Sequence, residues 1–377
     1  MKRRDNGDGT YSEIRPGLWQ ARLRLGKDRR ISLYAPTKAD AQRKLKEARR
    51  RHETGMRPDA GRLTVGEYLR RWVGAKTGPG THLRPSTAQR YRQIVDGHLI
   101  HMVGSHRLLS LSPTDVERAI SSAIEGGVSV AMAGHCKTVL GTALAQAIRD
   151  DLVGRNAAQA AKAPAYRRPE VKPLTREEVH ALIEAIDGHP LQPLIVTAVA
   201  TGLRQGELLG LQWADLDLER GTLTVRQALQ DGELVPTKTD KSRRTVGLPP
   251  DVVALLRQHR QGMREWRLAM GTGWHGADNP GEGLVFTNTI GRHLDGPTVT
   301  HQFQALLAEA GLPRIRFHDL RHTCATLLLN DGVPLHTVSR LLGHSQIAIT
   351  ADTYGHLVPD AAGEAAARMG VLLTRAG

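Results

Sequence analysis

The sequence predicts a multidomain protein that is mainly α-helical with small β elements. Apolar residues three and four positions apart, the periodicity of helices, recur through most of the chain after Leu63. Alternation of apolar and polar residues, the periodicity of strands, occurs in residues 18–35 and 222–249. Two stretches rich in proline, glycine or charge are typical of linkers, at 55–63 and 162–173. We therefore expect three domains, which cover residues 1–58, 63–163 and 173–377.

The first domain is expected to be a small β-sheet packed on one helix. In LWQARLRLG (18–26) apolar side chains alternate with polar and basic ones, and RRISLYAP (29–36) repeats the pattern. Thr37 is expected to start a helix, with Asp40 as its capping partner. The apolar stripe of this helix consists of Ala41, Leu45 and Ala48.

The basic charge of the chain points to an acidic polymer, most directly nucleic acid. The net charge is +14 and the isoelectric point is near 10.2. Residues 1–60 hold 17 Lys and Arg against 8 Asp and Glu, so +9 of the net charge lies in this leading segment. We interpret the segment as a DNA-binding module; the alternative is a solvated basic appendage. Its candidate DNA-binding residues are Arg22, Arg24, Arg29 and Arg30.

Residues 63–163 are expected to form a domain of four or five helices. Helical periodicity is present in TVGEYLRRWV (64–73), in the segment that Ser86 is expected to cap, and in two further segments that end near Ala163. No stretch of the chain approaches 18 apolar residues, and its start, MKRRDNGDGT, lacks the core of a signal peptide. We therefore expect a cytoplasmic protein with no membrane contact.

The string HDLRH (318–322) places two histidines four positions apart, as zinc peptidases do. Those enzymes need a glutamate where Asp319 stands, and Arg321 adds a permanent positive charge beside His318. A histidine and an arginine three positions apart share a helix face and suit a phosphate. We therefore expect no metal here, and we expect His322 to face elsewhere with a structural role.

Two further segments supply an arginine, an acid and a lysine. TGLRQGELLGLQW (201–213) is expected to be helical, with Arg204 and Glu207 three positions apart. Residues 222–249 are expected to form two strands joined at Asp231–Gly232, and the second strand carries Lys238. Beyond Pro173 the only lysines are Lys238 and Lys241. Because lysine can release a proton and arginine cannot, we expect a general acid at Lys238; the alternative is a pair of exposed hairpin lysines.

Two more segments place a histidine and a tyrosine near the end of the chain. SRLLGHS (339–345) is expected to end a helix at Gly343 and to leave His344 just beyond it. ITADTYGHL (349–357) is expected to hold Tyr354 in a short helix or turn. Arginines can neutralise phosphoryl oxygens, histidines can accept protons and a tyrosine can act as an oxygen nucleophile.

The order of these residues resembles the tyrosine recombinases, the phage-integrase family. The motifs that carry the resemblance, over residues 173–360, are TGLRQGELLGLQWAD, TKTDKSRRTVGLP, HDLRHTCAT, LLGHS and TADTYGHL. Residues 63–163 resemble the core-site-binding domain of this family in position and helicity, and residues 1–58 resemble its arm-type DNA-binding module. Residues 173–377 would then be its α-rich catalytic domain.

The resemblance implies DNA cleavage and rejoining without metal or cofactor. Tyr354 would attack the scissile phosphate to give a 3′-phosphotyrosine and a free 5′-hydroxyl. His318 would accept the tyrosine proton, and Lys238, favoured over Lys241 by its TKT context, would protonate the leaving oxygen. The phosphate oxygens would be bound by Arg204 and Arg321 with help from His344, and Glu207 would orient its neighbours.

The function expected from this resemblance is integration and excision of a mobile element, such as a prophage, in the nucleoid of a bacterial host. Its expected partners are double-stranded DNA attachment sites, further copies of the chain as a tetramer on paired sites, and accessory proteins that bend DNA or direct excision. The alternatives are a nicking-closing enzyme like type IB topoisomerase and a DNA-binding regulator without activity. The arm-like module and LLGHS favour the recombinase, and the intact cluster argues against the regulator.

The segment after Tyr354 is expected to form a helix that starts at Pro359–Asp360. Its apolar stripe consists of Ala362, Ala365, Ala366, Met369 and Leu372 or Leu373. Such a stripe is buried either on its own domain or on a neighbouring subunit, and the resemblance favours the neighbour.

Overall fold

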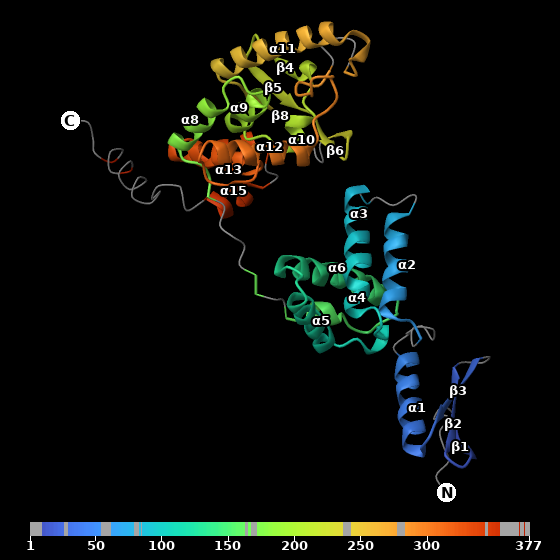
Figure 1. The fold of residues 1–377 in the computed structure, drawn as a ribbon. Coiled ribbons are helices and arrows are strands. Elements are labelled where there is room, and N and C mark those ends of the chain that lie inside the picture. Colours follow the sequence, from blue (N-terminus) through green and yellow to red (C-terminus); the bar gives the residue numbers. More distant parts are fainter. Residues whose placement is uncertain are drawn as a thin grey trace. The chain divides into compact units, whose positions relative to one another are not determined.

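A computed structural model describes the fold of this chain (Figure 1). The residues that it describes are 10–25, 29–53, 62–78, 83, 85–162, 165–166, 172–236, 243–276, 283–343, 346–354, 369 and 373. The chain divides into two compact units, Met1–Arg168 and Pro169–Gly377. Helices predominate and the strands are short, as the sequence predicts.

The first unit begins with a three-stranded antiparallel sheet in the order β1 (Thr10–Arg15), β2 (Leu18–Leu25), β3 (Arg29–Ala35). Helix α1 (Lys38–Glu53) packs on this sheet. The sequence predicts β2, β3 and α1, which are confirmed, but not β1. That strand is almost wholly exposed and carries no apolar alternation, so only its pairing with β2 defines it.

The core between this sheet and α1 includes apolar residues of the predicted strands and of the predicted helix. Ala21 and Leu23 are buried with Ala41 and Leu45, and the Thr37 hydroxyl accepts a hydrogen bond of 3.1 Å from the Asp40 amide. On the opposite face, the exposed Arg22 donates to Gln20 over 3.0 Å. The other candidate DNA-binding residues are Arg24, Arg29 and Arg30. Their backbone lies in β2 and β3, and their side chains lie outside the described structure.

The helices after Arg62 have a hydrophobic cluster of their own, which shares no buried residue with the cluster of the sheet and α1. They are α2 (Val65–Thr77), α3 (Pro85–Ile94), a π-helical turn (Val95–Leu99), α4 (Ile100–Val103), α5 (Pro113–Glu125), α6 (Val130–Arg149) and α7 (Ala157–Ala160). Reciprocal side-chain and backbone hydrogen bonds cap α2 at Thr64 and α5 at Ser112. Ser86 lies inside α3, which starts one residue earlier at a proline.

The second unit combines helices with two small sheets. Its helices are α8 (Arg176–Ala185), α9 (Gln192–Thr201), α10 (Gln205–Leu209), α11 (Pro250–Met270), α12 (Gly296–Glu309), α13 (Asp319–Asn330), α14 (Leu335–Leu342) and α15 (Ile347–Tyr354). One sheet has the order β4 (Leu216–Asp217), β5 (Thr222–Val225), β8 (Arg244–Gly247), and the other pairs β6 (Gln227–Gln230) with β7 (Glu233–Pro236). In Figure 1 the β4–β5–β8 sheet lies between α11 and α13, and α9 packs against both helices.

Residues 222–249 form four strands where the sequence predicts two. The turn at Asp231–Gly232 is confirmed, because both residues have positive φ, 52° and 82°, as tight hairpins require. The hairpin is fixed against α10 by a close backbone contact, since a Cβ atom on Gly210 would lie 2.6 Å from the amide nitrogen of Leu229. The structure thus holds the residues just before Lys238 against α10, which follows Arg204.

None of the described helices is both long and apolar enough to cross a lipid bilayer. In the predicted tail helix, Met369 and Leu373 are described and are 55% and 75% exposed. The other residues of that stripe, Ala362, Ala365, Ala366 and Leu372, lie outside the described residues, as do Pro359 and Asp360.

Candidate active site

Arg321 supplies a buried positive charge at the centre of the candidate site. The residue lies in the first turn of α13 and is only 4% exposed. Its Nη1 donates a 2.8 Å hydrogen bond to the carbonyl oxygen of Gly202, whereas its buried Nη2 has no hydrogen-bond partner among the residues that the structure describes. Burial and the nearby charge of Arg204 lower the pKa of Arg321 to about 9. A buried guanidinium with an unpartnered N–H is costly unless an anion satisfies it, so this group suits a phosphate.

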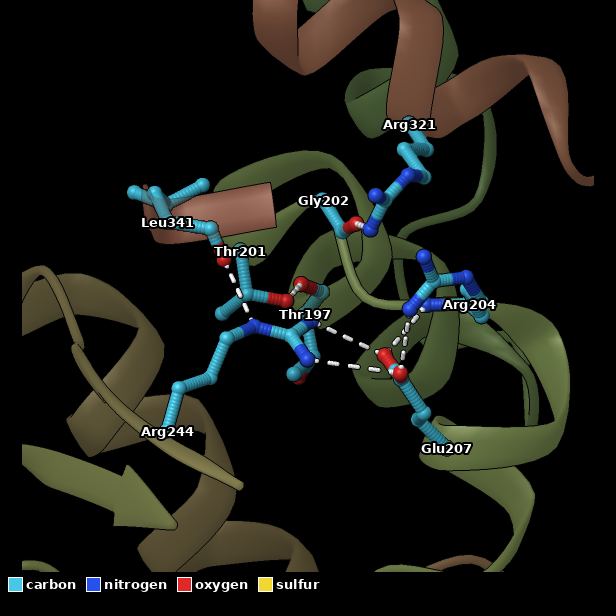
Figure 2. A network of polar contacts seen from close by, with 8 residues as sticks. All are labelled: Thr197, Thr201, Gly202, Arg204, Glu207, Arg244, Arg321 and Leu341. Atoms are coloured by element: carbon cyan, nitrogen blue, oxygen red, sulfur yellow. Dashed lines mark hydrogen bonds and ion pairs between the residues drawn. The ribbon is translucent and has the colours of Figure 1, made fainter. Parts of the chain in front are cut away.

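Glu207 lies between two arginines beside this group (Figure 2). Its carboxylate accepts from Arg204 Nη1 over 2.8 Å and from Arg244 Nη2 over 2.9 Å. Burial on its own would raise the pKa of Glu207, but the hydrogen bond and charge of Arg244, together with Arg204, hold that pKa below its ordinary value. The charged carboxylate therefore holds Arg204 through an ion pair of 2.8 Å.

The turn before Arg204 differs from its prediction, because residues 202–204 are not helical. Helix α9 ends at Thr201 and is capped by Gly202, whose φ of 61° is left-handed, and Arg204 is extended and precedes α10. A Cβ atom on Gly202 would lie 2.7 Å from Leu342 Cδ2 and 3.3 Å from Cys324 Sγ. The glycine thus allows α13 and α14 to approach the turn, which places Arg321 and Arg204 on the same side of it (Figure 2).

Arg244 belongs to this network, and sequence reasoning missed it. Its side chain is buried, and Nε donates a 2.7 Å hydrogen bond to the carbonyl oxygen of Leu341. In the β5–β8 register Arg244 pairs with the buried Val225, and Val246, two positions along, is also buried. Strand alternation could therefore have placed Arg244 on the inner face, whereas the neighbouring Arg243 is exposed.

His318 lies at the start of α13 with its ring open to solvent. Partial desolvation and the positive charges of Arg321, His322 and Arg204 lower the pKa of His318 to about 4, against the opposing effect of Asp319. His318 is therefore neutral at pH 7 and is able to accept a proton or a hydrogen bond.

Asp319, which breaks the zinc-peptidase motif, has a structural role at the same helix end. Its buried carboxylate accepts from the backbone amide of Arg316 over 2.8 Å and from Arg316 Nη2 over 2.7 Å. Burial would raise the pKa of Asp319, but these hydrogen bonds outweigh it and hold that pKa below its ordinary value. The ion pair links the first turn of α13 to the residues before it. It therefore fixes the position of the turn that carries Arg321.

Tyr354 is the last residue of α15 and is 4% exposed. Its hydroxyl lies 2.6 Å from Nδ1 of His322, and the centroids of the two rings are 5.6 Å apart. Burial raises the pKa of Tyr354 to about 12, although the charge of Arg321 acts in the opposite direction. The phenol is therefore protonated at pH 7 and hydrogen-bonded to a histidine.

The expectation that His322 faces elsewhere is wrong. On a helix, residues four positions apart lie on one face, and the rings of His318 and His322 are 5.9 Å apart. His322 thus points into the same site as the tyrosine.

The structure brings five of the predicted residues together: Arg204, Glu207, His318, Arg321 and Tyr354. Lys238, Lys241 and His344 lie outside the described residues. Next to His344, the predicted helix end at Gly343 is confirmed by its φ of 68°. A Cβ atom there would lie 2.8 Å from Arg244 Nη1, so glycine is required for space as well as conformation.

Residues 172–360 match the model of the phage integrase family. A tyrosine recombinase XerC-like protein of Caldanaerobacter subterraneus subsp. tengcongensis is 30% identical over 358 residues, which cover 89% of this chain and 90% of that protein. An integrase of Streptomyces ambofaciens is 32% identical over 377 residues, with 94% and 93% covered.

Among solved structures, the Tn1549 transposon integrase in complex with a circular intermediate DNA has a TM-score of 0.69 at 22% identity. The matched region covers 81% of this chain and 99% of the Tn1549 integrase chain. A lambda integrase tetramer bound to a Holliday junction has a TM-score of 0.58 at 19% identity, with 93% and 96% covered. These two likenesses concern the fold.

The fold and the sequence relationships define a DNA recombinase of the tyrosine class. The chain belongs to the phage integrase family. The fold class, the enzyme class and the family expected from the sequence are confirmed.

Proposed function

We propose that this recombinase cleaves and rejoins double-stranded DNA at specific sites through Tyr354. The proposal is carried by two buried groups in one site. Nη2 of Arg321 has no hydrogen-bond partner among the described residues, and the charge of Arg321 acts on the pKa of the Tyr354 hydroxyl. A phosphate that satisfies Arg321 would lie within reach of a nucleophile. The integrases of similar fold have been solved with DNA, which supports the same substrate here.

Each residue of the site has a role in this chemistry. Arg204 and Arg321 bind the non-bridging oxygens of the scissile phosphate, with His344 beside them, and stabilise the charge that develops there. Glu207 holds Arg204 in place. Lys238 is the proposed acid for the leaving 5′-oxygen, with Lys241 as the alternative. For the proton of Tyr354 the chain offers His318, which the family resemblance implies, and His322, which contacts the hydroxyl.

The reaction conserves the energy of the phosphodiester bond. The Tyr354 oxygen forms a bond to phosphorus as the bond to the 5′-oxygen breaks, which leaves a 3′-phosphotyrosine. A 5′-hydroxyl from a second duplex then attacks this link and releases the tyrosine. Neither step consumes ATP, so the enzyme is suited to integrate and excise a mobile element such as a prophage. We place this activity on nucleoid DNA in the cytoplasm of a bacterial host.

We further propose that the chain uses three domains, over residues 1–58, 63–163 and 173–377. Separate hydrophobic clusters in the sheet with α1 and in α2 to α7 support the first boundary. The first domain would bind arm-type sites through basic residues such as the exposed Arg22, and the second would bind the core site.

Paired sites are proposed to assemble a tetramer. Met369 and Leu373 are exposed and four positions apart, so among the described residues these two side chains have little apolar cover. A neighbouring subunit would supply it, in line with the lambda integrase tetramer solved on a Holliday junction. Accessory proteins that bend DNA or direct excision would act on this assembly.

Trapping of a covalent adduct tests the proposed chemistry. A cognate site nicked next to the cleavage position should give a protein–DNA adduct on denaturing gels, with or without EDTA. Tyr354→Phe should abolish the adduct and retain site binding, because it removes only the nucleophilic oxygen. Tyr166→Phe, at a half-exposed tyrosine of the first unit, is the matched control and should give the parent yield. An undiminished adduct with Tyr354→Phe would refute the assignment.

A further inference from the structure

Among the residues that the structure describes, the hydroxyl of Tyr354 lies close to a polar group of His322. The Oη–Nδ1 distance of 2.6 Å is within the range expected between a nucleophile and its general base. Packing and helix geometry restrict both side chains. Tyr354 packs in a buried cluster with Ala325 and Leu329. His322 lies in α13, directly after Arg321. The contact is therefore a fixed feature of the site.

The two histidines of HDLRH have different surroundings. At the start of α13, partial desolvation and the positive charge of Arg321 outweigh the opposing effect of Asp319 and lower the pKa of His318 to about 4. A histidine of that kind is a weak proton acceptor, and a neutral ring beside Arg321 is placed to hydrogen-bond a phosphate instead. His322 lies one helical turn further and contacts the phenol directly.

We propose that His322 is a catalytic residue that accepts the Tyr354 proton during cleavage. The inference rests on the proposed function, because it assigns a role within the same reaction. It differs from the role that the family resemblance implies for His318.

With its ring proton on Nε2, neutral His322 accepts at Nδ1. As the tyrosine oxygen bonds to phosphorus, its O–H bond breaks and the proton moves to Nδ1, which makes an imidazolium. The bond from phosphorus to the 5′-oxygen breaks, and that oxygen takes a proton from the general acid. In rejoining, the imidazolium returns the proton to the departing tyrosine oxygen.

Substitution of His322 by asparagine separates proton transfer from positioning. The Oδ1 atom of asparagine can occupy the place of Nδ1 and accept the hydrogen bond, but it cannot take the proton. His322→Asn should slow adduct formation on the nicked site by about 10²-fold or more, with unchanged site binding. The unfolding midpoint is measured beside it, and His322→Gln serves as a second variant if the first is unfolded.

Fluorinated tyrosine at position 354 provides the readout that a structural role would not affect. Its phenol is more acidic, so it needs less help from a base and should restore most of the rate that His322→Asn loses. The same replacement should not rescue Arg321→Lys, whose defect lies in binding the phosphate. Rescue of His318→Asn but not of His322→Asn, or a parent rate with His322→Asn, would overturn the proposal. Absence of any adduct with the unaltered protein would instead refute the proposed function itself.

Discussion

Partial desolvation and the nearby positive charge together determine the protonation state of His318. Partial desolvation, together with Arg321, His322 and Arg204, lowers the pKa of His318 to about 4, so the ring gains a proton only in acid far below pH 7. In NMR of protein with isotope-labelled histidine, the His318 ring of the DNA-free protein should therefore remain neutral down to about pH 5, whereas an ordinary histidine titrates near 6.5. The signal is assigned by its loss in His318→Gln.

Arg321→Gln supplies the matched comparison for this titration. It removes the nearest positive charge and keeps a planar polar side chain, so the midpoint of His318 should rise toward its ordinary value. A midpoint above pH 6 in the unaltered protein would contradict the surroundings assigned to His318.

Among the secondary-structure elements, β8 joins two parts of the site. Through Arg244 it contacts Glu207 of α10 on one side and the end of α14 on the other. If Arg244 were removed, Arg204 would be the remaining ion-pair partner of the buried Glu207 carboxylate. The carbonyl oxygen of Leu341 would also lose the hydrogen bond from Arg244.

Arg244→Ala should accordingly lower the free energy of unfolding by about 3 kcal/mol, as expected when one partner of a buried ion pair is removed. The adjacent Arg243→Ala changes the same charge at an exposed position and should alter that free energy by less than about 0.5 kcal/mol. Chemical denaturation of both variants measures the difference. Equal effects would show that the buried ion pair contributes nothing specific.

The same elements show which features of the site and fold could be predicted from the sequence and which could not. That Arg204, Glu207, Arg321 and Tyr354 lie in one site could be predicted, because residue type and motif order indicate it. The contact of Tyr354 with His322 could not, since it depends on how α15 packs on α13. Strand β1 also escaped prediction, as its exposed residues carry no apolar pattern and only pairing with β2 makes it a strand.

For the whole molecule, assembly depends on the end of the chain. The exposure of Met369 and Leu373 leads us to expect a protein that is largely monomeric in solution and tetrameric on paired sites. Truncation after Val358 should leave single-site binding intact and abolish the synaptic complex, as measured by gel shift and analytical ultracentrifugation. Replacement of both residues by serine is the milder counterpart and should weaken the same complex. Normal recombination by the truncated protein would show that the tail serves only its own subunit.

Covalent linkage of Tyr354 to DNA can be measured by locating the bond in the adduct. The adduct formed on a nicked site is digested with nuclease and protease, and the modified peptide is sequenced by mass spectrometry. We expect a 3′-phosphonucleotide on Tyr354 and a free 5′-hydroxyl on the released strand. A nucleotide on any other residue, or a link through the 5′ end of the DNA, would contradict this expectation.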